Sequence, residues 1–356
     1  MTAAVITGFG SAVPAPMSQQ RLWDEFFRGY YRDGRLAERI WRSSGITTRH
    51  GVVNPVDEDV STWGTGARMQ RYVAEALPLG KEAVSAALAS AGLAPADVGL
   101  FAVATCTGYA TPGLDILLSR DLGMRDTVRR LAVGHMGCYA AVPGLAAVAD
   151  FVAARARPAV LLCLELTSLH IQPAPPDRHP PRLTDIQQMV AHALFSDAAA
   201  AVVLEPARPG GLEVVDVVAR TDVDSADHMT WDVTDLGFRM GLSPRVPDVL
   251  EIHARPVVDE LLGRHSLTIG DVAGWAVHPG GPRILEVVGA SLDLPATTLA
   301  ASYGVLRDYG NCSSATLLLV LDRVRAQRAL ATGDHVVAMA FGPGLTLCAA
   351  LLRQSR

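Results

Sequence analysis

Short, almost wholly apolar runs alternate along this chain with segments that have an apolar helical face. Residues 100–105 form such a run, which is typical of a strand buried on both faces of a sheet. Residues 81–91 place alanine, valine and leucine on one helical face, and Gly92 ends the helix. The same alternation continues with a helix over 114–122, a strand over 131–133, a helix over 139–154 and a strand over 159–164. The pattern predicts a layered α/β protein.

The two halves of the chain resemble each other in sequence. When residues 97–103 are laid over residues 271–277, the same offset lays Val84 and Leu88 over Val258 and Leu262, and Cys138 over Cys312. A gapless register of this kind indicates an internal repeat. We therefore expect two duplicated halves, 1–208 and 209–356, each with a mixed sheet, packed around shared helices. The division falls where Pro-Gly-Gly interrupts two strand-like runs.

Composition excludes several classes of protein. The 356 residues are 49% hydrophobic with a formal net charge of −5, which excludes a disordered chain and gives no strong field for nucleic acid. The sequence predicts neither a secretory segment nor a membrane span. Five cysteines without a CxxC pair indicate free thiols in a reducing compartment, so we expect a cytoplasmic protein without a metal site.

Three polar residues lie at turns that the two halves of the repeat can bring together. Cys138 follows a strand and a turn and opens a helix of small residues, while Asn311 opens the matching helix of the second half. His278 ends the strand 275–277 and precedes Pro-Gly-Gly, a turn that can direct the imidazole into the same cleft. If the halves pack about a pseudo-twofold axis, we expect the three side chains to meet.

Such a trio suits acyl transfer through sulfur. A helix N-terminus and a nearby imidazolium stabilise a thiolate, so we expect the pKa of Cys138 to be lowered and the thiol to be partly ionised. His278 and Asn311 can donate hydrogen bonds to a thioester enolate left by loss of carbon dioxide from a malonyl group. Cys138 as a small core residue and Asn311 as a helix cap are the simpler alternatives. A papain-like protease shares the order Cys, His, Asn, but its local cysteine signature is missing here.

Four motifs in order resemble the type III polyketide synthases, the chalcone synthase-like family within the thiolase-fold ketosynthases. They are Gly137-Cys138-Tyr139-Ala140-Ala141, His278-Pro279-Gly280-Gly281-Pro282, Tyr309-Gly310-Asn311-Cys312-Ser313-Ser314-Ala315 and Phe341-Gly342-Pro343-Gly344-Leu345-Thr346. The resemblance implies a thiolase-like layered αβαβα fold and a homodimer. It also implies that an acyl-CoA starter is loaded on Cys138, extended repeatedly with malonyl-CoA and cyclised, with no bound cofactor or carrier protein.

The resemblance also suggests residues around the substrate. Phe195 and Phe238 match two aromatic gatekeepers between the coenzyme A tunnel and the cavity. Cys106, His170 and Ser313 fall on positions that line or shape the cavity. Arg39 matches a basic position that contacts a coenzyme A phosphate, although a solvated helix face is an equally good interpretation.

Departures from the family pattern leave the cavity shape open. Ser196-Asp197-Ala198 replaces a Gly-Asp-Gly, Ala340 replaces a glycine, and the proline-rich stretch 171–183 carries extra residues. Two alternatives also stay open. One is a single-condensation ketoacyl synthase III-like enzyme, and the other is a non-catalytic acyl-binding partner on the same fold. The sequence does not identify the starter or the product.

Overall fold

The structure is a computed structural model, and it describes residues 2–177 and 180–356. Residues 178 and 179 of the proline-rich stretch lie outside the described residues. The strands are β1 Ala4–Ala12, β2 Pro16–Ser18, β3 Thr48–His50, β4 Leu100–Ala104, β5 Arg129–Val133, β6 Ala159–Glu165, β7 Ala198–Pro206, β8 Leu212–Thr221, β9 Met229–Thr234, β10 Gly237–Leu242, β11 Val272–Val277, β12 His335–Gly342 and β13 Thr346–Gln354. The α-helices are α1 Gln19–Leu22, α2 Arg28–Tyr30, α3 Arg35–Arg42, α4 Thr65–Ala91, α5 Leu114–Leu122, α6 Ala141–Arg155, α7 Leu183–Leu194, α8 Val246–Gly263, α9 Pro282–Ser291, α10 Ala300–Tyr309 and α11 Ser314–Gln327.

The large sheet has two parts that correspond to the two halves of the sequence. Its strand order is β11-β12-β13-β8-β1-β7-β6-β4-β5. In the first half β4 runs parallel to β5 and β6, and in the second half β11 runs parallel to β12. We expected two separate sheets, but β1 and β8 join them through the pairs Val5–Glu213 and Ile6–Leu212. The turn that contains residues 208 and 209 connects β7 to β8.

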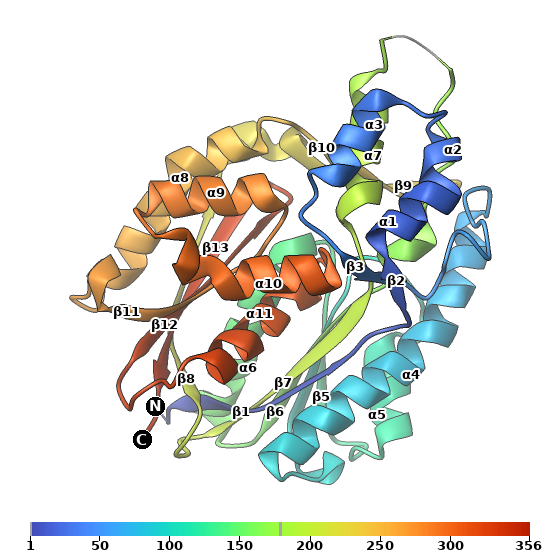
Figure 1. Cartoon of the computed structure of the whole chain (residues 1–356). Helices are drawn as coiled ribbons and strands as arrows, with labels where there is room; N and C mark the ends of the chain where they lie inside the picture. Colours follow the sequence, from blue (N-terminus) through green and yellow to red (C-terminus); the bar gives the residue numbers. More distant parts are fainter. Residues whose placement is uncertain (1, 178–179) are drawn as a thin grey trace.

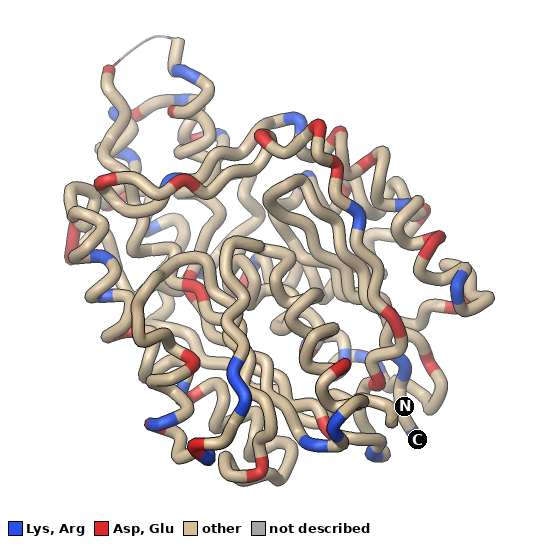
Figure 2. The backbone as a smooth tube through the Cα atoms, turned by 180° about the vertical axis from the view of Figure 1, so that it is seen from behind, with Lys and Arg blue, Asp and Glu red and all other residues tan. Residues whose placement is uncertain are grey.

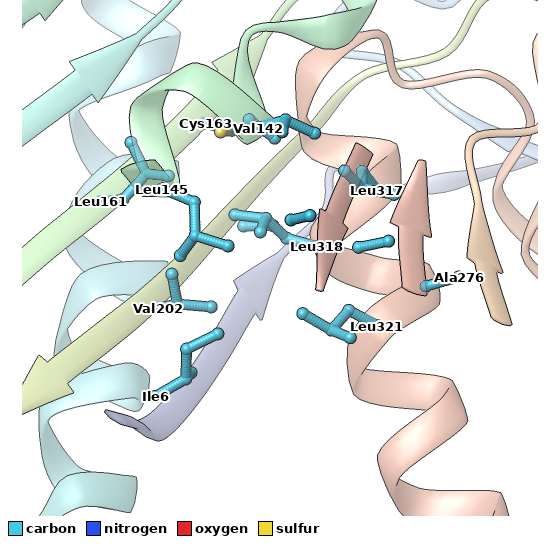
Figure 3. Close-up of a cluster of buried hydrophobic side chains, with 14 of the residues drawn as sticks. Ile6, Val142, Leu145, Leu161, Cys163, Val202, Ala276, Leu317, Leu318 and Leu321 are labelled. Carbon is cyan, nitrogen blue, oxygen red and sulfur yellow. The ribbon is translucent and has the colours of Figure 1, made fainter. Parts of the chain in front are cut away.

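Two helices, α6 and α11, form the layer between the two parts of the sheet. Both contact strands from each half of the chain. Figure 3 shows part of the resulting core, in which side chains of α6 and α11 meet those of strands from both halves. Alanine and valine are frequent in this layer, and their small size lets helices and sheet approach closely. Cys163, inside the all-apolar strand β6, is fully buried in this core.

Two further helix layers cover the outer faces of the sheet. Helices α4 and α5 lie on the first half, and α8 and α9 lie on the second (Figure 1). The order helix, sheet, helix, sheet, helix is the layered αβαβα architecture that the family resemblance implies. The segment Gly137–Arg155 has the length and composition of a membrane-spanning helix, with mean hydropathy 1.5, but 56% of it is buried inside the protein. It is the central core helix.

A smaller group of elements stands above one end of the sheet. It contains α1, α2, α3, α7 and the hairpin of β9 and β10, and these lie together at the top right of Figure 1. Helix α7 packs against both α3 and β10. Figure 2 shows acidic and basic residues mixed over the outside of the molecule, as the small net charge predicts.

The sheet brings chemically useful residues to one edge. Cys106 follows β4, Glu165 is the last residue of β6, and His278 follows β11 directly. The carboxyl ends of parallel strands are the usual place for sites in α/β proteins, because loops and helix N-termini converge there. The smaller group of elements stands over this same edge.

Candidate active site

Cys138 lies in a turn between β5 and the central helix α6. A single 3-10 turn, Gly137–Tyr139, carries it, and its side chain is 6% exposed. Gly137 has φ +63, and a Cβ at this position would lie 2.9 Å from Cδ of Pro343. Only glycine fits a left-handed conformation with so close a neighbour. The Pro343 loop of the second half thus closes over the cysteine turn of the first.

The first residues of α11 and the turn before it contact the cysteine from the second half. The Cys138 thiol donates to Oγ of Ser313 at 3.6 Å, and Oδ1 of Asn311 accepts from the backbone N–H of Ser313 at 2.9 Å. Asn311 also donates from Nδ2 to the Gly280 carbonyl at 3.4 Å, next to the His278 loop. The two helix starts therefore converge, as the repeat predicts.

The sheet fixes the backbone of His278, and the imidazole ring extends beyond it. Its backbone N–H continues the β11–β12 ladder to the Met339 carbonyl at 2.8 Å, and its ring packs edge-on against Phe341 at 5.6 Å. Although the residue is 1% exposed, neither ring nitrogen has a hydrogen-bond partner among the described residues. Buried polar atoms are rarely left without a partner, so these two nitrogens point to a ligand.

A cavity of about 590 Å³ brings the three residues together. Cys138, His278 and Asn311 all line it, and its mouth lies between α3, α7 and the start of α9. This volume lies within the ~300–1,000 Å³ range of pockets for small molecules. The sulfur, the imidazole and the carboxamide therefore share one chamber.

Burial sets the ionisation of both catalytic candidates. It raises the pKa of Cys138 to about 12, against a smaller opposite effect of the Ser313 hydrogen bond. Burial also lowers the pKa of His278 to about 3. The expected lowering of the Cys138 pKa is not seen, because desolvation of the buried thiol is the largest effect. Burial therefore favours the neutral form of both side chains.

Two smaller cavities share lining residues with the large one. An inner chamber of about 120 Å³ is lined by Cys138, Cys106 and Ser313, and a side cavity of about 60 Å³ is lined by His170 and Phe238. Phe195 lines all three cavities. Of the residues suggested by resemblance, Phe195, Cys106 and Ser313 thus lie beside the sulfur. His170 and Phe238 lie in the side cavity instead.

A fully buried carboxylate, Glu165, was missed by the sequence analysis. It accepts hydrogen bonds from the Cys106 N–H at 3.0 Å, Thr107 Oγ1 at 2.8 Å and Ser314 Oγ at 2.6 Å. Burial raises its pKa, and these hydrogen bonds act in the opposite direction. An acidic residue at the carboxyl end of an all-apolar strand was the available signal.

Arg49 is a second buried charge that the sequence analysis missed. Its guanidinium donates to the carbonyls of His192 and Phe195 at the C-terminus of α7. Directly beyond, the Asn311 N–H donates to the Leu194 carbonyl at 2.9 Å, and the Asn311 carbonyl accepts from Ser196. A cation that satisfies the last carbonyls of α7 therefore also fixes the backbone beside Asn311.

Arg39 lies outside these cavities. It is exposed on α3, where Arg35, Arg39 and Arg42 line one surface pocket together with Ser43, and Ser43 also lines the mouth of the large cavity. Arg42 is paired with Glu38 at 2.6 Å. Arginine side chains thus stand at the entrance.

The remaining cysteines are structural. Cys163, Cys312 and Cys348 are buried in the central core, and all five cysteines are free thiols. Within residues 2–177 and 180–356, no cluster of three His, Cys, Asp or Glu side chains is arranged to hold a metal ion.

Comparison with known proteins extends over nearly the whole chain. Residues 2–208 match the N-terminal domain, and residues 214–355 the C-terminal domain, of chalcone and stilbene synthases. The chain is 32% identical to the alpha-pyrone synthesis polyketide synthase-like Pks18 of Mycobacterium tuberculosis, covering 97% of this chain and 90% of that protein. It is 34% identical to a 1,3,6,8-tetrahydroxynaphthalene synthase of Streptomyces peucetius, covering 90% of this chain and 84% of that protein.

Solved structures that are similar to this chain come from the same family of enzymes. The 1,3,6,8-tetrahydroxynaphthalene synthase of Streptomyces coelicolor superimposes with a TM-score of 0.91 at 26% identity, and PKS-I of the brown alga Ectocarpus siliculosus with 0.89 at 30% identity. Each superposition covers 99% of both chains. The fold and the cavity define an acyl-transferring enzyme of the thiolase-like class. The chain belongs to the chalcone and stilbene synthase family and is a type III polyketide synthase.

The buried imidazole of His278 predicts a pH-dependent loss of stability. Its pKa is about 3 when folded, against about 6.5 unfolded, so below pH 6.5 only the unfolded chain takes up the proton. The stabilisation is complete above pH 6.5 and is lost as the pH falls. Between pH 7 and 5 the unfolding free energy of the wild type should fall by about 2 kcal/mol more than that of His278→Gln. Urea unfolding at each pH measures this, and parallel curves for the two proteins would contradict a neutral buried imidazole.

Proposed function

We propose that Cys138 is the nucleophile that carries the growing polyketide, and that His278 and Asn311 bind the thioester carbonyl of malonyl-CoA. The observation that carries this proposal is the pair of unpartnered nitrogens of buried His278 in a cavity shared with Cys138 and Asn311. In this division of roles the half 1–208 supplies the sulfur and the half 209–356 supplies the imidazole and the carboxamide.

The loading step transfers an acyl group from coenzyme A to Cys138. The thiol proton must leave for the sulfur to attack, and a ring nitrogen of His278, which has no partner among the described residues, lies in the same cavity to accept it. The sulfur then forms a bond to the acyl carbon, the bond from that carbon to the coenzyme A sulfur breaks, and coenzyme A leaves as the thiol with the proton. One thioester replaces another, so the step is nearly balanced in bond energy.

The condensation step uses His278 and Asn311 as donors. Loss of carbon dioxide from the malonyl group leaves its electron pair as a thioester enolate. A neutral imidazole carries one N–H, so His278 can donate to the enolate oxygen without being protonated. The enolate carbon attacks the acyl carbonyl on Cys138, a carbon–carbon bond forms, and the cysteine sulfur leaves.

Replacing the nucleophile should separate condensation from decarboxylation. Cys138→Ala should abolish polyketide formation, while malonyl-CoA decarboxylation continues because both carbonyl donors are intact. Cys348→Ala, which removes a buried thiol away from the cavities, should keep both activities. His278→Gln and Asn311→Ala should each lower decarboxylation by about 10²- to 10³-fold. Product analysis with labelled malonyl-CoA tests this, and polyketide from Cys138→Ala would refute the assignment.

The arginines of α3 are suited to the phosphates of coenzyme A. Arg35, Arg39 and Arg42 stand beside the mouth of the cavity, and Arg39 is exposed. Arginine forks bind phosphate oxygens through two N–H groups. Arg39 is thus assigned to a phosphate of the acyl-CoA starter and of malonyl-CoA.

Removing the Arg39 charge should weaken binding of the coenzyme A ester alone. Arg39→Ala should raise KM for malonyl-CoA about tenfold, or about 1.4 kcal/mol, with little change in kcat, and the effect should shrink in high salt. The N-acetylcysteamine thioester of malonate lacks the phosphates, so its KM should not change. Arg120→Ala on α5 is the matched control. An equal loss with both substrates would exclude a phosphate contact.

We further infer a homodimer formed across β5. This strand ends the large sheet, and Arg129, Arg130, Leu131 and Ala132 are exposed along it. An exposed edge strand offers unpaired backbone groups to another chain. The exposed residue His135, just beyond β5, lines the inner chamber, so a second copy over this face would close the chamber. The free cysteines further suit a cytoplasmic location.

A charge on this edge should separate the two copies. Leu131→Arg should shift the protein from dimer to monomer in analytical ultracentrifugation and should lower polyketide formation. Val233→Arg, at a side chain that is 74% exposed on β9, should leave the dimer intact. A wild-type protein that sediments as a monomer would refute the dimer without affecting the assignment of Cys138.

A further inference from the structure

Cys138 stands between two cavities, and each of them is lined by a different histidine. The cavity of about 590 Å³, here called the outer cavity, is lined by His278, and the inner chamber of about 120 Å³ is lined by His135. Cys138 lines both spaces. Among the described residues, His278 does not line the inner chamber and His135 does not line the outer cavity. Each side of the sulfur therefore has its own histidine.

The two spaces suit different stages of the reaction. In the proposed function malonyl-CoA enters by the outer cavity, whose mouth lies beside the α3 arginines, and its thioester carbonyl meets His278. The acyl chain already bound to Cys138 then extends on the other side of the sulfur, along the inner chamber. Phe195 and Trp231 line that chamber and give it aromatic walls. Steps that act on the bound chain therefore take place beside His135.

His135 has an unusual backbone conformation. It lies in the turn between β5 and Cys138 with φ +64, in the left-handed region that residues other than glycine seldom adopt. Such strained positions persist only where the surrounding structure holds them, and they are frequent at active sites. The turn places His135 three residues before Cys138 and at the same chamber.

Other polar side chains of the inner chamber are already hydrogen-bonded within the protein. The hydroxyl of Thr107 donates to Glu165 at 2.8 Å, and the hydroxyl of Thr167 donates to a main-chain carbonyl at 2.9 Å. The Cys106 thiol donates to the same carboxylate at 3.6 Å, and burial raises its pKa well above the usual value. Among the described residues, none forms a hydrogen bond with the ring of His135.

His135 also has the chemistry that the other lining residues lack. Imidazole is the side chain that takes up and returns protons near neutral pH. Of the described residues that line the inner chamber, His135 is the one with an imidazole. A proton that must be moved on this side of Cys138 therefore has one suitable carrier.

We propose that His135 is a catalytic residue of the ring-closing step that releases the chain from Cys138. The imidazole takes a proton from the methylene carbon or enol oxygen of the chain that attacks the thioester. A bond forms from this atom to the thioester carbon, the bond from that carbon to the Cys138 sulfur breaks, and the sulfur leaves with the electron pair. The imidazolium returns the proton to the sulfur, so the thiol is restored and no further reactant is needed.

The buried sulfur explains why a proton donor is required at this step. Burial raises the pKa of Cys138 to about 12, so expulsion of the sulfur as a lasting thiolate is unfavourable. A proton delivered from His135 removes this cost. The inference rests on the proposed role of Cys138 and adds a second imidazole, which acts on the chain while His278 acts on malonyl-CoA.

Mass spectrometry of the intact full-length enzyme tests the proposal. The enzyme is supplied with malonyl-CoA and with whichever of acetyl-, octanoyl- and benzoyl-CoA loads fastest. In His135→Asn, starter loading and malonyl-CoA decarboxylation should proceed at wild-type rates. Release of cyclised product should fall about 10²-fold, a usual contribution of a positioned proton-transferring side chain. The fully extended chain should therefore accumulate on Cys138.

The variants are chosen to keep the turn intact. Asparagine, like histidine, is enriched in the left-handed region, and glycine adopts it freely, yet neither can relay a proton. His135→Asn and His135→Gly should therefore give the same result. His265→Gln is the matched control, because His265 is an exposed histidine that pairs with Asp216 at 3.0 Å and lines none of these cavities. It should release product like the wild type.

The possible results separate the two levels of inference. Wild-type release by His135→Asn, with no chain left on Cys138, would overturn the role of His135 and leave the nucleophile in place. An equal loss of loading, decarboxylation and release would also overturn it, as would a variant that sediments as a monomer beside a dimeric wild type, because His135 would then shape the turn or the interface. If no starter forms an adduct on wild-type Cys138, the proposed function itself fails.

Discussion

The hydrogen bonds of Glu165 connect the two halves of the chain at the point where the site is built. The carboxylate belongs to the first half and accepts from Cys106 and Thr107 on one side and from Ser314, at the start of α11, on the other. A buried carboxylate is costly to leave unpaired, so the loop after β4 and the start of α11 are held to one position relative to it. Ser313, the neighbour of Ser314, then lies within reach of both Cys138 and Cys106.

Three histidines with lowered pKa values differ in whether their ring nitrogens have hydrogen-bond partners. His170 is buried and His192 is half-buried, desolvation lowers their pKa values to about 4 and about 3, and each has hydrogen-bond partners at both ring nitrogens. His278 is 1% exposed and has no partner at either ring nitrogen among residues 2–177 and 180–356. His170 and His192 therefore stabilise the wall of the side cavity, while His278 retains its hydrogen-bonding capacity for a substrate. The difference lies in the surroundings, because the residue type is the same.

Periodicity and the internal repeat were sufficient to predict the layers and the meeting of Cys138, Asn311 and the His278 loop. These features follow from backbone geometry, since matching strands and helices place matching turns at one edge. The partners of Glu165, the place of Arg49 and the ionisation of Cys138 could not be predicted in the same way. They depend on which side chains meet between segments far apart in the chain and on how much water remains there, and a pattern within one segment contains neither.

Close packing around one glycine connects the proline-rich stretch to the side cavity. Gly237 has φ +87, and a Cβ there would lie 2.6 Å from Cδ of Arg68 and 2.9 Å from Nδ1 of His170. Arg68 is fully buried and donates to the carbonyl of Ile171, and Gln172 donates to the carbonyls of Leu236 and Phe238. The first residues of the proline-rich stretch are thus bound to the hairpin that carries Phe238 and Trp231. Changes in that stretch would therefore move the wall of the inner chamber without touching Cys138, so cavity shape can vary in this fold while the residues that perform the chemistry stay fixed.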